Sequence, residues 1–183
     1  MTRRFLSGLI LGAGGSTRLG QPKQLLPFKG TTLLGWVVAQ AEGAPALDEV
    51  VVVLGRAAEE IRNRVAVARA RVVENPAFGE GCSSSYRAGI GALDERAEAV
   101  MVLLGDQPGV DSAIIERVAE AWRRDGGRIV LASYHGKRGH PMLFTRDLFD
   151  TLVGLRGDKA AWKIVDAHPE WVREVPLDCS LPP

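Results

Sequence analysis

A glycine-rich segment with two basic side chains lies near the N-terminus. It spans residues 11–23 with the sequence LGAGGSTRLGQPK. Glycines let successive backbone N–H groups converge on an anion without an intervening Cβ, and each cation adds attraction for phosphate. One cation about 4 Å from a phosphate charge contributes on the order of 4 kcal/mol at an effective dielectric constant of about 20. The segment therefore predicts a polyphosphate-binding loop formed by Leu11, Gly12, Ala13, Gly14, Gly15, Ser16, Arg18 and Lys23.

Two well-known glycine-rich loops do not fit this segment. A P-loop requires Lys directly after the second glycine of GxxxxG, whereas Gly20 is followed by Gln21 and Pro22. A dinucleotide-binding fingerprint requires glycine at Thr17 and an acidic residue after the second strand, where this chain has Gly55. A glycine-rich turn with solvated charges is the alternative without a function, and the pair of cations favours binding.

A carboxylate follows the apolar run of residues 100–104, in the tetrapeptide GDQP. This places Asp106 at the carboxyl end of a predicted central strand. A triphosphate is bound together with Mg²⁺, a hard cation that takes one or two carboxylates in addition to phosphate oxygens. Asp106 is therefore a candidate metal ligand, and on these residues alone a turn aspartate before Pro108 is an equal alternative.

Short apolar runs and longer amphipathic stretches alternate along the chain. The runs are continuous, as is typical of buried strands, and cover residues 6–11, 50–54, 71–73, 100–104 and 129–132. The stretches with helical spacing cover residues 32–41, 58–68, 84–93 and 112–123. This order predicts an α/β fold, with one domain over residues 1–183 that forms a three-layer αβα sandwich around a mainly parallel, Rossmann-like sheet. In such a sheet, ligands bind at the carboxyl ends of the strands where the chain order reverses.

The composition is that of an ordinary soluble protein, with 183 residues of which 46% are hydrophobic and 25% charged. Lys plus Arg number 23 against 22 for Asp plus Glu, which leaves no broad field to attract nucleic acid or an anionic membrane. The first apolar run is too short for a signal peptide or a membrane span. Cys82 and Cys179 form no CxxC pair. We expect a cytoplasmic protein with reduced cysteines that acts on neither nucleic acid nor membranes.

The first motif resembles a family signature. Residues 11–27, LGAGGSTRLGQPKQLLP, are similar to LAAGxSxRxGxxKxLLP of the MobA-like nucleotidyltransferases, which include molybdenum cofactor cytidylyltransferase and its guanylyltransferase relative. The resemblance implies a fold of the nucleotide-diphospho-sugar transferase type. It also implies that Gly14, Gly15, Ser16 and Arg18 wrap the triphosphate, while Lys23 neutralises its charge during transfer.

Two positions of the signature bear on the donor nucleotide. Gly12 replaces the usual alanine, a small change that should not remove the loop. Members with alanine at the position of Ala13 tend to use CTP, whereas guanylyltransferases carry glycine there, so the resemblance favours cytidine. The GDQP tetrapeptide is characteristic of the cytidylyltransferase branch, and this implies that Asp106 holds Mg²⁺ and is catalytic together with Arg18 and Lys23.

A second segment, residues 75–89, resembles the family pattern NPxxxxGxxxSxxxG. Its small residues, amides and hydroxyls suit the reading of a base edge or a ribose, although a plain loop with a Ser helix cap explains them almost as well. Cys82 lies within it, but the sequence places no general base beside that thiol, so we discount a nucleophile. The resemblance implies nucleotide contacts by Asn75, Gly81, Ser83 and Ser85.

Two further segments resemble the acceptor side of the family. Residues 136–144 are similar to GxxGxPxxF and imply acceptor contacts by His140 and Pro141, although a lone histidine is more often structural. Residues 155–162 are similar to LxGDxGAR and imply that Asp158 completes the metal site and the acceptor site, with a helix cap as the alternative. Here the chain departs from the pattern, because Ala160 replaces glycine and Trp162 replaces arginine. The second change removes a cation near the acceptor.

These observations predict a Mg²⁺-dependent nucleotidyltransferase. An acceptor phosphate oxygen attacks the α-phosphorus in line and pyrophosphate leaves, with catalysis by positioning and charge neutralisation. By resemblance the donor is CTP, the acceptor is the molybdopterin cofactor phosphate, and a molybdenum enzyme receives the product. The alternatives are transfer to a sugar phosphate, a polyol phosphate or a phospholactate-type acid, and a non-catalytic accessory protein that binds molybdenum cofactor or nucleotide.

Overall fold

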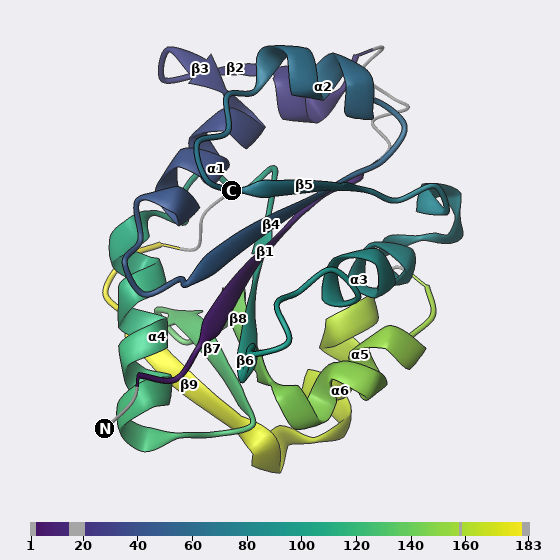
Figure 1. Ribbon diagram of the computed structural model, residues 1–183. Helices are drawn as coiled ribbons and strands as arrows, with labels where there is room; N and C mark the ends of the chain where they lie inside the picture. The colour runs from purple at the N-terminus through teal and green to yellow at the C-terminus, as the bar shows by residue number, and fades with distance from the viewer. Residues whose placement is uncertain (1–2, 15–20, 158, 181–183) are drawn as a thin grey trace.

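The computed structural model describes residues 3–14, 21–157 and 159–180. Its centre is a seven-stranded sheet, and a two-stranded sheet of β2 (Pro27–Phe28) and β3 (Thr31–Thr32) lies beside it (Figure 1). Among the described residues, no helix is both long and apolar enough to cross a bilayer. The large sheet has the strand order β5 (Arg71–Glu74), β4 (Glu49–Leu54), β1 (Leu6–Gly12), β6 (Ala99–Leu104), β8 (Lys137–Thr145), β7 (Ile129–Tyr134) and β9 (Val172–Leu177).

The sheet is mainly parallel, as the alternating pattern predicts. β1 pairs in parallel with β4 and β6, β4 with β5, and β7 with β9, whereas β8 runs antiparallel to both β6 and β7. The chain order reverses at β1, because β4 and β5 continue the sheet on one side and β6 continues it on the other. The carboxyl ends of β1 and β6 therefore meet where an open α/β sheet binds its ligand.

Helices cover both faces of the sheet, which confirms the three-layer arrangement (Figure 1). One core cluster joins the sheet to α1 (Leu33–Glu42), α2 (Ala58–Arg64) and α4 (Ser112–Asp125). The other joins it to α3 (Cys82–Ile90), α5 (Phe149–Gly154) and α6 (Ala160–Ala167). Short 3₁₀ turns complete the order of elements: η1 (Lys23–Leu25), η2 (Phe78–Glu80), η3 (Arg146–Leu148) and η4 (Pro169–Trp171).

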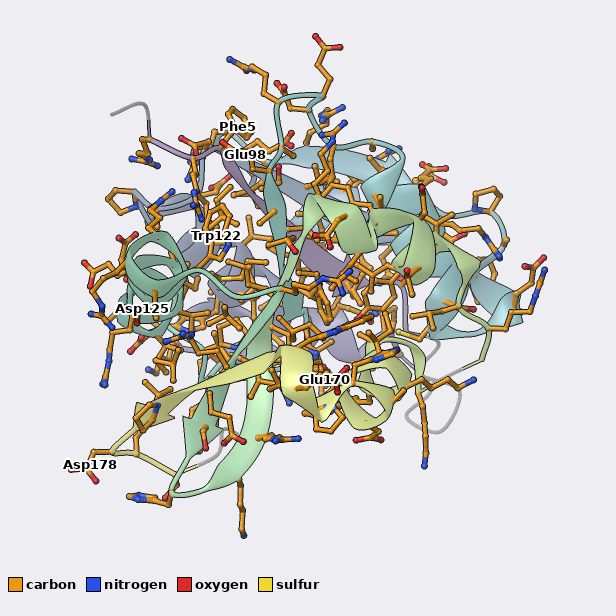
Figure 2. All side chains as sticks on the ribbon, turned by 90° about the horizontal axis from the view of Figure 1, so that it is seen from below. Phe5, Glu98, Trp122, Asp125, Glu170 and Asp178 are labelled. Carbon is orange, nitrogen blue, oxygen red and sulfur yellow. The ribbon has the colours of Figure 1, made fainter. Side chains whose placement is uncertain are left out.

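The two longest helices begin at side-chain caps. The side chain of Thr32 accepts a hydrogen bond from the Gly35 N–H at the start of α1, and Asp111 accepts one from the Ile114 N–H at the start of α4. Each cap satisfies a backbone donor that the first turn leaves unpaired. Along α4, the apolar spacing turns Trp122 toward the sheet, where it is 2% exposed (Figure 2). Both helices are thus fixed in place behind the carboxyl ends of the strands.

Several boundaries, and two strands, differ from the sequence prediction. α2 ends at Arg64 instead of residue 68, because Glu42 draws the following backbone away by accepting hydrogen bonds from Ala68, Arg69 and Ala70. α3 begins at Cys82, two residues before the predicted start. The apolar and polar residues of β8 and β9 form strands that the sequence analysis did not assign.

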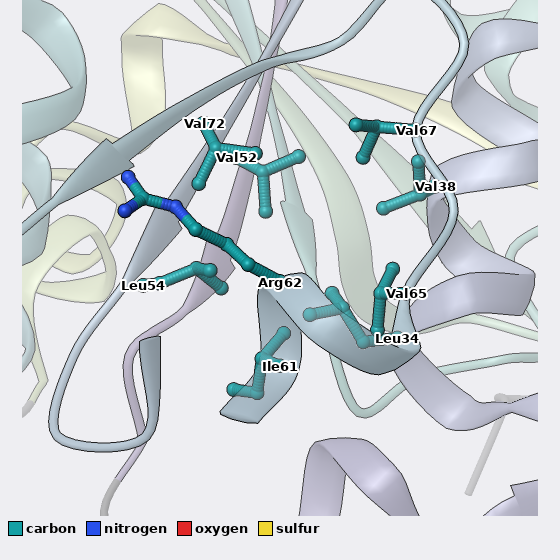
Figure 3. A pocket seen from close by; sticks show the side chains of 9 residues that line it. All are labelled: Leu34, Val38, Val52, Leu54, Ile61, Arg62, Val65, Val67 and Val72. Atoms are coloured by element: carbon teal, nitrogen blue, oxygen red, sulfur yellow. The ribbon is translucent and has the colours of Figure 1, made fainter. Parts of the chain in front are cut away.

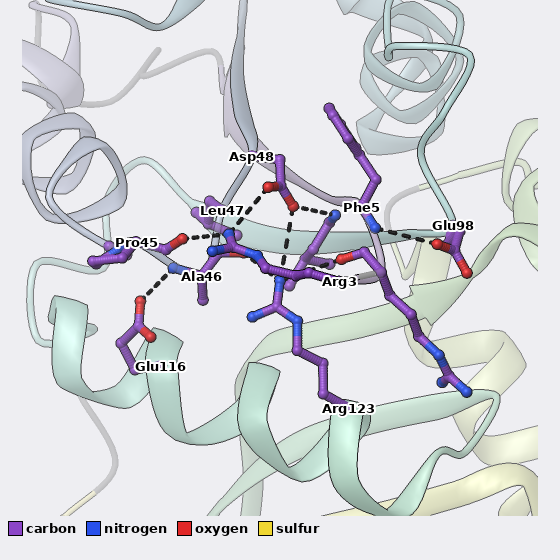
Figure 4. Close-up of polar contacts among 12 residues, drawn as sticks. Arg3, Phe5, Pro45, Ala46, Leu47, Asp48, Glu98, Glu116 and Arg123 are labelled. Carbon is purple, nitrogen blue, oxygen red and sulfur yellow. Dashed lines mark hydrogen bonds and ion pairs between the residues drawn. The ribbon is translucent and has the colours of Figure 1, made fainter. Parts of the chain in front are cut away.

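A polar cluster joins the opposite, amino ends of the strands (Figure 4). The Asp48 carboxylate accepts a hydrogen bond of 2.8 Å from the Leu6 N–H and pairs with Arg3 at 3.0 Å and with Arg123 at 3.8 Å. These contacts hold the start of β1, the residue before β4 and the end of α4 together. The loops at the carboxyl ends of the strands therefore extend from a rigid sheet.

Candidate active site

The glycine-rich segment continues directly from β1. Leu11 and Gly12 are the last residues of the strand, and Ala13 and Gly14 extend it toward the carboxyl end of the sheet. Gln24, from η1, is 6% exposed, and its Nε2 donates hydrogen bonds to the Gly12 carbonyl at 2.7 Å and the Gly14 carbonyl at 2.9 Å. These two bonds fix the described start of the segment.

Gln24 is a site residue that sequence reasoning missed. The family signature leaves its position open, so the motif gives it no weight. The sequence signal was the polar side chain of Gln24 in the otherwise apolar run QLL. If that run is buried, the amide of Gln24 needs hydrogen-bond partners, and nearby backbone groups can supply them. Within the described part of the chain its Oε1 is buried without a hydrogen-bond partner.

Lys23 and Asp106 meet beside this segment. The Nζ of Lys23 lies 2.9 Å from Oδ2 of Asp106, and the two side chains are 46% and 42% exposed. Asp106 follows the last residue of β6 by two positions, at the carboxyl end of a central strand, as the sequence analysis predicts. The contact places one cation and one carboxylate together, within reach of a solvent-borne ligand.

Glycines allow the strand ends to approach closely. A methyl group on Gly105 would lie 3.1 Å from the Leu11 carbonyl oxygen and 3.3 Å from the Gly12 Cα. The Gly105 N–H also donates to the Leu11 carbonyl at 3.0 Å. A methyl group on Gly55 would lie 2.9 Å from the Ala13 carbonyl oxygen. The backbone before Asp106 therefore lies directly against the start of the glycine-rich segment.

The segment after β5 is tied together by its own polar groups. Asn75 is 3% exposed, and its Nδ2 donates to Ser84 Oγ at 2.8 Å and to Ser85 Oγ at 3.2 Å. Its Oδ1 accepts from the Ala77 N–H at 3.0 Å. Gly81 adopts a φ of +92° at the start of α3, a conformation that favours glycine. In this structure the amide of Asn75 holds the loop to α3.

Ser83 and Ser85 lie in the first turn of α3 and are 2% and 5% exposed. A methyl group on Gly89, further along the helix, would overlap Leu9 Cδ1, so α3 packs closely against β1. This contact lies near the end of the helix, whereas Ser83 and Ser85 lie in its first turn. Nucleotide contacts by Asn75, Gly81, Ser83 and Ser85 stay predictions.

His140 and Pro141 lie on β8, beside β6 in the sheet. The imidazole of His140 is 7% exposed and packs edge-on against the half-buried Trp162 of α6, with ring centroids 6.0 Å apart. Burial lowers the pKa of His140 to about 4, although the negative charge of Asp106 acts in the opposite direction. The ring is therefore neutral at about pH 7. This is an uncharged, aromatic side of the site.

Four predicted site residues, namely Gly15, Ser16, Arg18 and Asp158, lie outside the described residues. Within the described ranges, no group of three or more His, Cys, Asp or Glu side chains is placed to hold a metal ion. The exposed carboxylate of Asp106 nevertheless fits a Mg²⁺ ion bound with a triphosphate, because such an ion takes one or two carboxylates and fills its other positions with phosphate oxygens and water. Asp106 is the described residue that would hold it.

Comparison with known proteins matches residues 8–172 to the MobA-like NTP transferase domain. The chain belongs to this family. Its mainly parallel sheet with helices on both faces is the nucleotide-diphospho-sugar transferase fold, and nucleotidyltransferase chemistry is the activity that the family supports.

Proteins that are similar in sequence to this MobA-like chain have different names. Nicotine blue oxidoreductase of Paenarthrobacter nicotinovorans is 32% identical, over 96% of this chain and 87% of that protein. Molybdenum cofactor cytidylyltransferase of Escherichia coli K12 is 27% identical, over 75% of this chain and 69% of that protein. Among solved structures, the manganese complex of Rv0371C from Mycobacterium tuberculosis H37Rv is 34% identical, with a TM-score of 0.83 over 97% of this chain and 91% of that one.

Proposed function

We propose that this chain transfers CMP from CTP to a phosphorylated acceptor and releases pyrophosphate. The observation that carries the proposal is the 2.9 Å contact between Lys23 Nζ and Asp106 Oδ2 at the carboxyl end of β6. A triphosphate with its divalent cation requires a protein cation and a carboxylate at one place, next to converging backbone amides. Gly12 to Gly14, held by Gln24, supply the described start of that backbone.

The proposed reaction needs no covalent enzyme intermediate. An oxygen of the acceptor phosphate forms a bond to the α-phosphorus while the bond from that phosphorus to the bridging oxygen of the β-phosphate breaks, and pyrophosphate leaves with the bonding electrons. The ammonium group of Lys23 donates hydrogen bonds to the phosphate oxygens on which negative charge grows. Mg²⁺, held by Asp106 and by resemblance also by Asp158, supplies further neutralisation of that charge when bound.

The identity of the two substrates rests on resemblance. Ala13 stands where CTP-using members carry alanine, and the Escherichia coli relative is a molybdenum cofactor cytidylyltransferase. We accordingly propose CTP as the donor and the molybdopterin cofactor phosphate as the acceptor, with a molybdenum enzyme as recipient of the product. Trp162 stands in place of the family arginine, so this position offers the acceptor an indole instead of a cation.

The test is pyrophosphate release. Each of CTP, GTP, ATP and UTP is incubated with the protein, Mg²⁺ or Mn²⁺, and molybdopterin cofactor, a sugar phosphate, a polyol phosphate or 2-phospholactate. Release with CTP and molybdopterin is the expected result, and release with another acceptor would reassign the substrate within the same chemistry. Nucleotide binding without release for every acceptor would contradict the proposal and favour the accessory role.

Oxidoreduction is a second candidate, because the 32% identical relative is named nicotine blue oxidoreductase. A dinucleotide-binding fingerprint is absent from the first loop, where Thr17 replaces the required glycine, and this makes NADH or NADPH a poor fit to that segment. The assay follows the absorbance of NADH or NADPH with nicotine blue as the oxidant. Turnover there, with no pyrophosphate released from any triphosphate, would replace the nucleotidyl-transfer proposal.

A further inference from the structure

An apolar cavity of about 280 Å³ lies between the sheet and the helices α1 and α2 (Figure 3). Val67, at 41% exposure, is among its lining residues, so the cavity reaches the surface beside that side chain. Eight of the nine lining side chains are aliphatic, and they come from α1, β4, α2, the segment after α2, and β5: Leu34, Val38, Val52, Leu54, Ile61, Val65, Val67 and Val72, with Arg62 as the ninth.

The charge at this cavity is already neutralised. Arg62 contributes its aliphatic stem to the lining, and its guanidinium points along the sheet, away from Val38 and Val67 (Figure 3). That group pairs with Glu74 at 2.5 Å. An anionic ligand would have to compete with the Glu74 carboxylate, whereas an uncharged apolar ligand would leave the pair intact and bury only hydrocarbon. The chemistry of the wall therefore selects a neutral, apolar occupant.

The volume sets the size of that occupant. An engineered apolar cavity of about 150 Å³ stays dry and binds benzene or xenon. The present cavity, at about 280 Å³, is nearly twice as large. It therefore suits an aromatic or branched aliphatic molecule of roughly ten non-hydrogen atoms.

Two lining residues also touch the backbone of the candidate active site. A methyl group on Gly12 would lie 3.2 Å from Leu54 Cδ2 and 3.5 Å from Leu34 Cδ1. A methyl group on Gly105 would lie 2.9 Å from the same Leu34 atom. Leu34 and Leu54 thus form a single layer of side chains between the cavity and the backbone of Gly12 and Gly105, next to Asp106.

We propose that this cavity is a binding site for a small, uncharged apolar effector, which acts on the active site through Leu34 and Leu54. A ligand that fills the cavity supports both leucines from behind and restricts the backbone that receives the nucleotide. Because part of the ordering cost is then met before nucleotide binds, the effector tightens nucleotide binding. The site itself is independent of the proposed function, and only its effect on nucleotide affinity rests on that function.

The test uses p-xylene as the probe and NMR of methyl-labelled Leu and Val together with backbone amides. We expect p-xylene to shift the methyl signals of Leu34, Leu54 and Val72, and the amide signals of Gly12 and Gly105. Methyl signals on the other face of the sheet, such as those of Leu9, should stay in place. Absence of shifts at the cavity methyls, or equal shifts on both faces, overturns the site. Cavity shifts without amide shifts overturn the coupling.

Two variants make the test specific. Val72→Phe fills the cavity from β5, and Val67→Trp blocks it from a position that is 41% exposed, where solvent accommodates the larger side chain; either should abolish the p-xylene shifts. Val73→Phe is the matched control, because Val73 is the next residue of β5 and packs against the core on the opposite face. It should retain the shifts. Shifts that persist in both blocking variants contradict the assignment.

Nucleotide titrations complete the experiment. In the unmodified protein, saturating p-xylene should lower the Kd of CTP with Mg²⁺ about fivefold or more, and it should leave the Kd of Val67→Trp unchanged. An unchanged Kd in both proteins overturns the effector role. If CTP fails to bind with or without p-xylene, the proposed function fails, while the methyl and amide shifts still decide the cavity and its coupling.

Discussion

Lys23 and Asp106 form a pair whose strength points to ligand binding more than to folding. Each side chain is more than two-fifths exposed, and an ion pair of this kind contributes at most about 1 kcal/mol to stability. Such a contact is readily exchanged for stronger ones to a triphosphate and its cation. Removal of either charge should therefore do little damage to the fold.

We predict that Lys23→Met and Asp106→Asn each lower kcat for pyrophosphate release by about 100-fold or more, the size expected when a group that neutralises transition-state charge is lost. Thermal melting should change little. Lys29→Met is the control, because Lys29 lies over the Trp36 ring, 4.5 Å from its centroid, and carries no proposed role. Full activity in Asp106→Asn would remove that carboxylate from the site.

Gln24 acts on the site through the backbone. Its Nε2 serves two carbonyl groups of the glycine-rich segment, so Gln24→Leu leaves both without this donor. We predict that KM for CTP rises about tenfold, equivalent to about 1.4 kcal/mol, while kcat changes less. Steady-state kinetics measure the two constants separately. Gln40→Leu is the control, since Gln40 also bonds to the backbone, but to the Ser112 N–H at the start of α4 instead of the glycine-rich segment. Equal effects in both variants would point to general destabilisation.

At the scale of elements, the site depends on how closely the ends of β1 and β6 approach. Gly105→Ala places a methyl group 3.1 Å from the Leu11 carbonyl oxygen and 3.3 Å from the Gly12 Cα, and backbone atoms cannot give way as a flexible side chain does. The two ends must separate and move Asp106. We predict at least a tenfold loss of kcat/KM, equivalent to about 1.4 kcal/mol.

Gly154→Ala is the matched control for this strand contact, because a methyl group there meets nothing within 4 Å. Gly154 lies in α5, where alanine has a higher helix propensity than glycine. We expect this variant to keep full activity and to melt at the same temperature or higher. If Gly105→Ala behaved in the same way, close packing of β1 against β6 would not matter to the site.

The position of α6 bears on acceptor choice. Trp162 of α6 packs against His140. The family pattern has arginine at the position of Trp162, so this position carries no cation here. We predict that Trp162→Arg lowers KM for a phosphorylated acceptor about tenfold, equivalent to about 1.4 kcal/mol, and leaves KM for CTP unchanged. Trp171→Arg is the control, because Trp171 stacks on His168 instead. A rise in the acceptor KM of Trp162→Arg would mean that the acceptor is recognised by the indole.

Elements that follow a local pattern could be predicted, and those that depend on distant partners could not. β1, β4 and β6 are buried, mainly apolar strands in the inner part of the sheet, and each has at least one parallel neighbour, so their apolar pattern can be recognised in the sequence. β8 contains Gly139 and Pro141, two residue types that strands disfavour, and it forms by pairing with β7 across the turn at His135 and Gly136 and with β6, which is distant in the sequence. The sequence analysis therefore assigned residues 136–144 to a motif but predicted no strand for them.

The site shows the same division. Asp106 was found because a carboxylate after a buried central strand is a local signal, and its partner Lys23 belongs to a contiguous motif. The distance of 2.9 Å between them, and the role of Gln24, depend on how η1 folds back onto β1. Sequence spacing does not show how η1 folds back onto β1. Lys23 and Asp106 were therefore predicted as two separate site residues, and the hydrogen bonds from Gln24 were not predicted.

For the molecule as a whole, His140 is expected to link stability to pH. The residue is 7% exposed, and burial lowers its pKa from 6.5 to about 4 in the folded chain. Between these values the unfolded chain binds a proton at this position and the folded chain does not. Stability contributed by the neutral ring is thus fully present above the unfolded pKa and is lost as the pH falls toward the folded pKa.

The expected loss between about pH 7 and about pH 5 is about 2 kcal/mol from this single group. Urea unfolding of the metal-free protein at the two pH values measures it, and His140→Phe should reduce the difference by that amount, because phenylalanine keeps the edge-on contact with Trp162 but cannot take up a proton. His168→Phe is the control, since the His168 side chain is 40% exposed.

Comparing the pH difference within each variant cancels any change in absolute stability. If His140→Phe kept the full pH dependence, proton uptake at other carboxylates and histidines would have to account for it, and the burial of His140 behind α6 would not govern the acid stability of the fold.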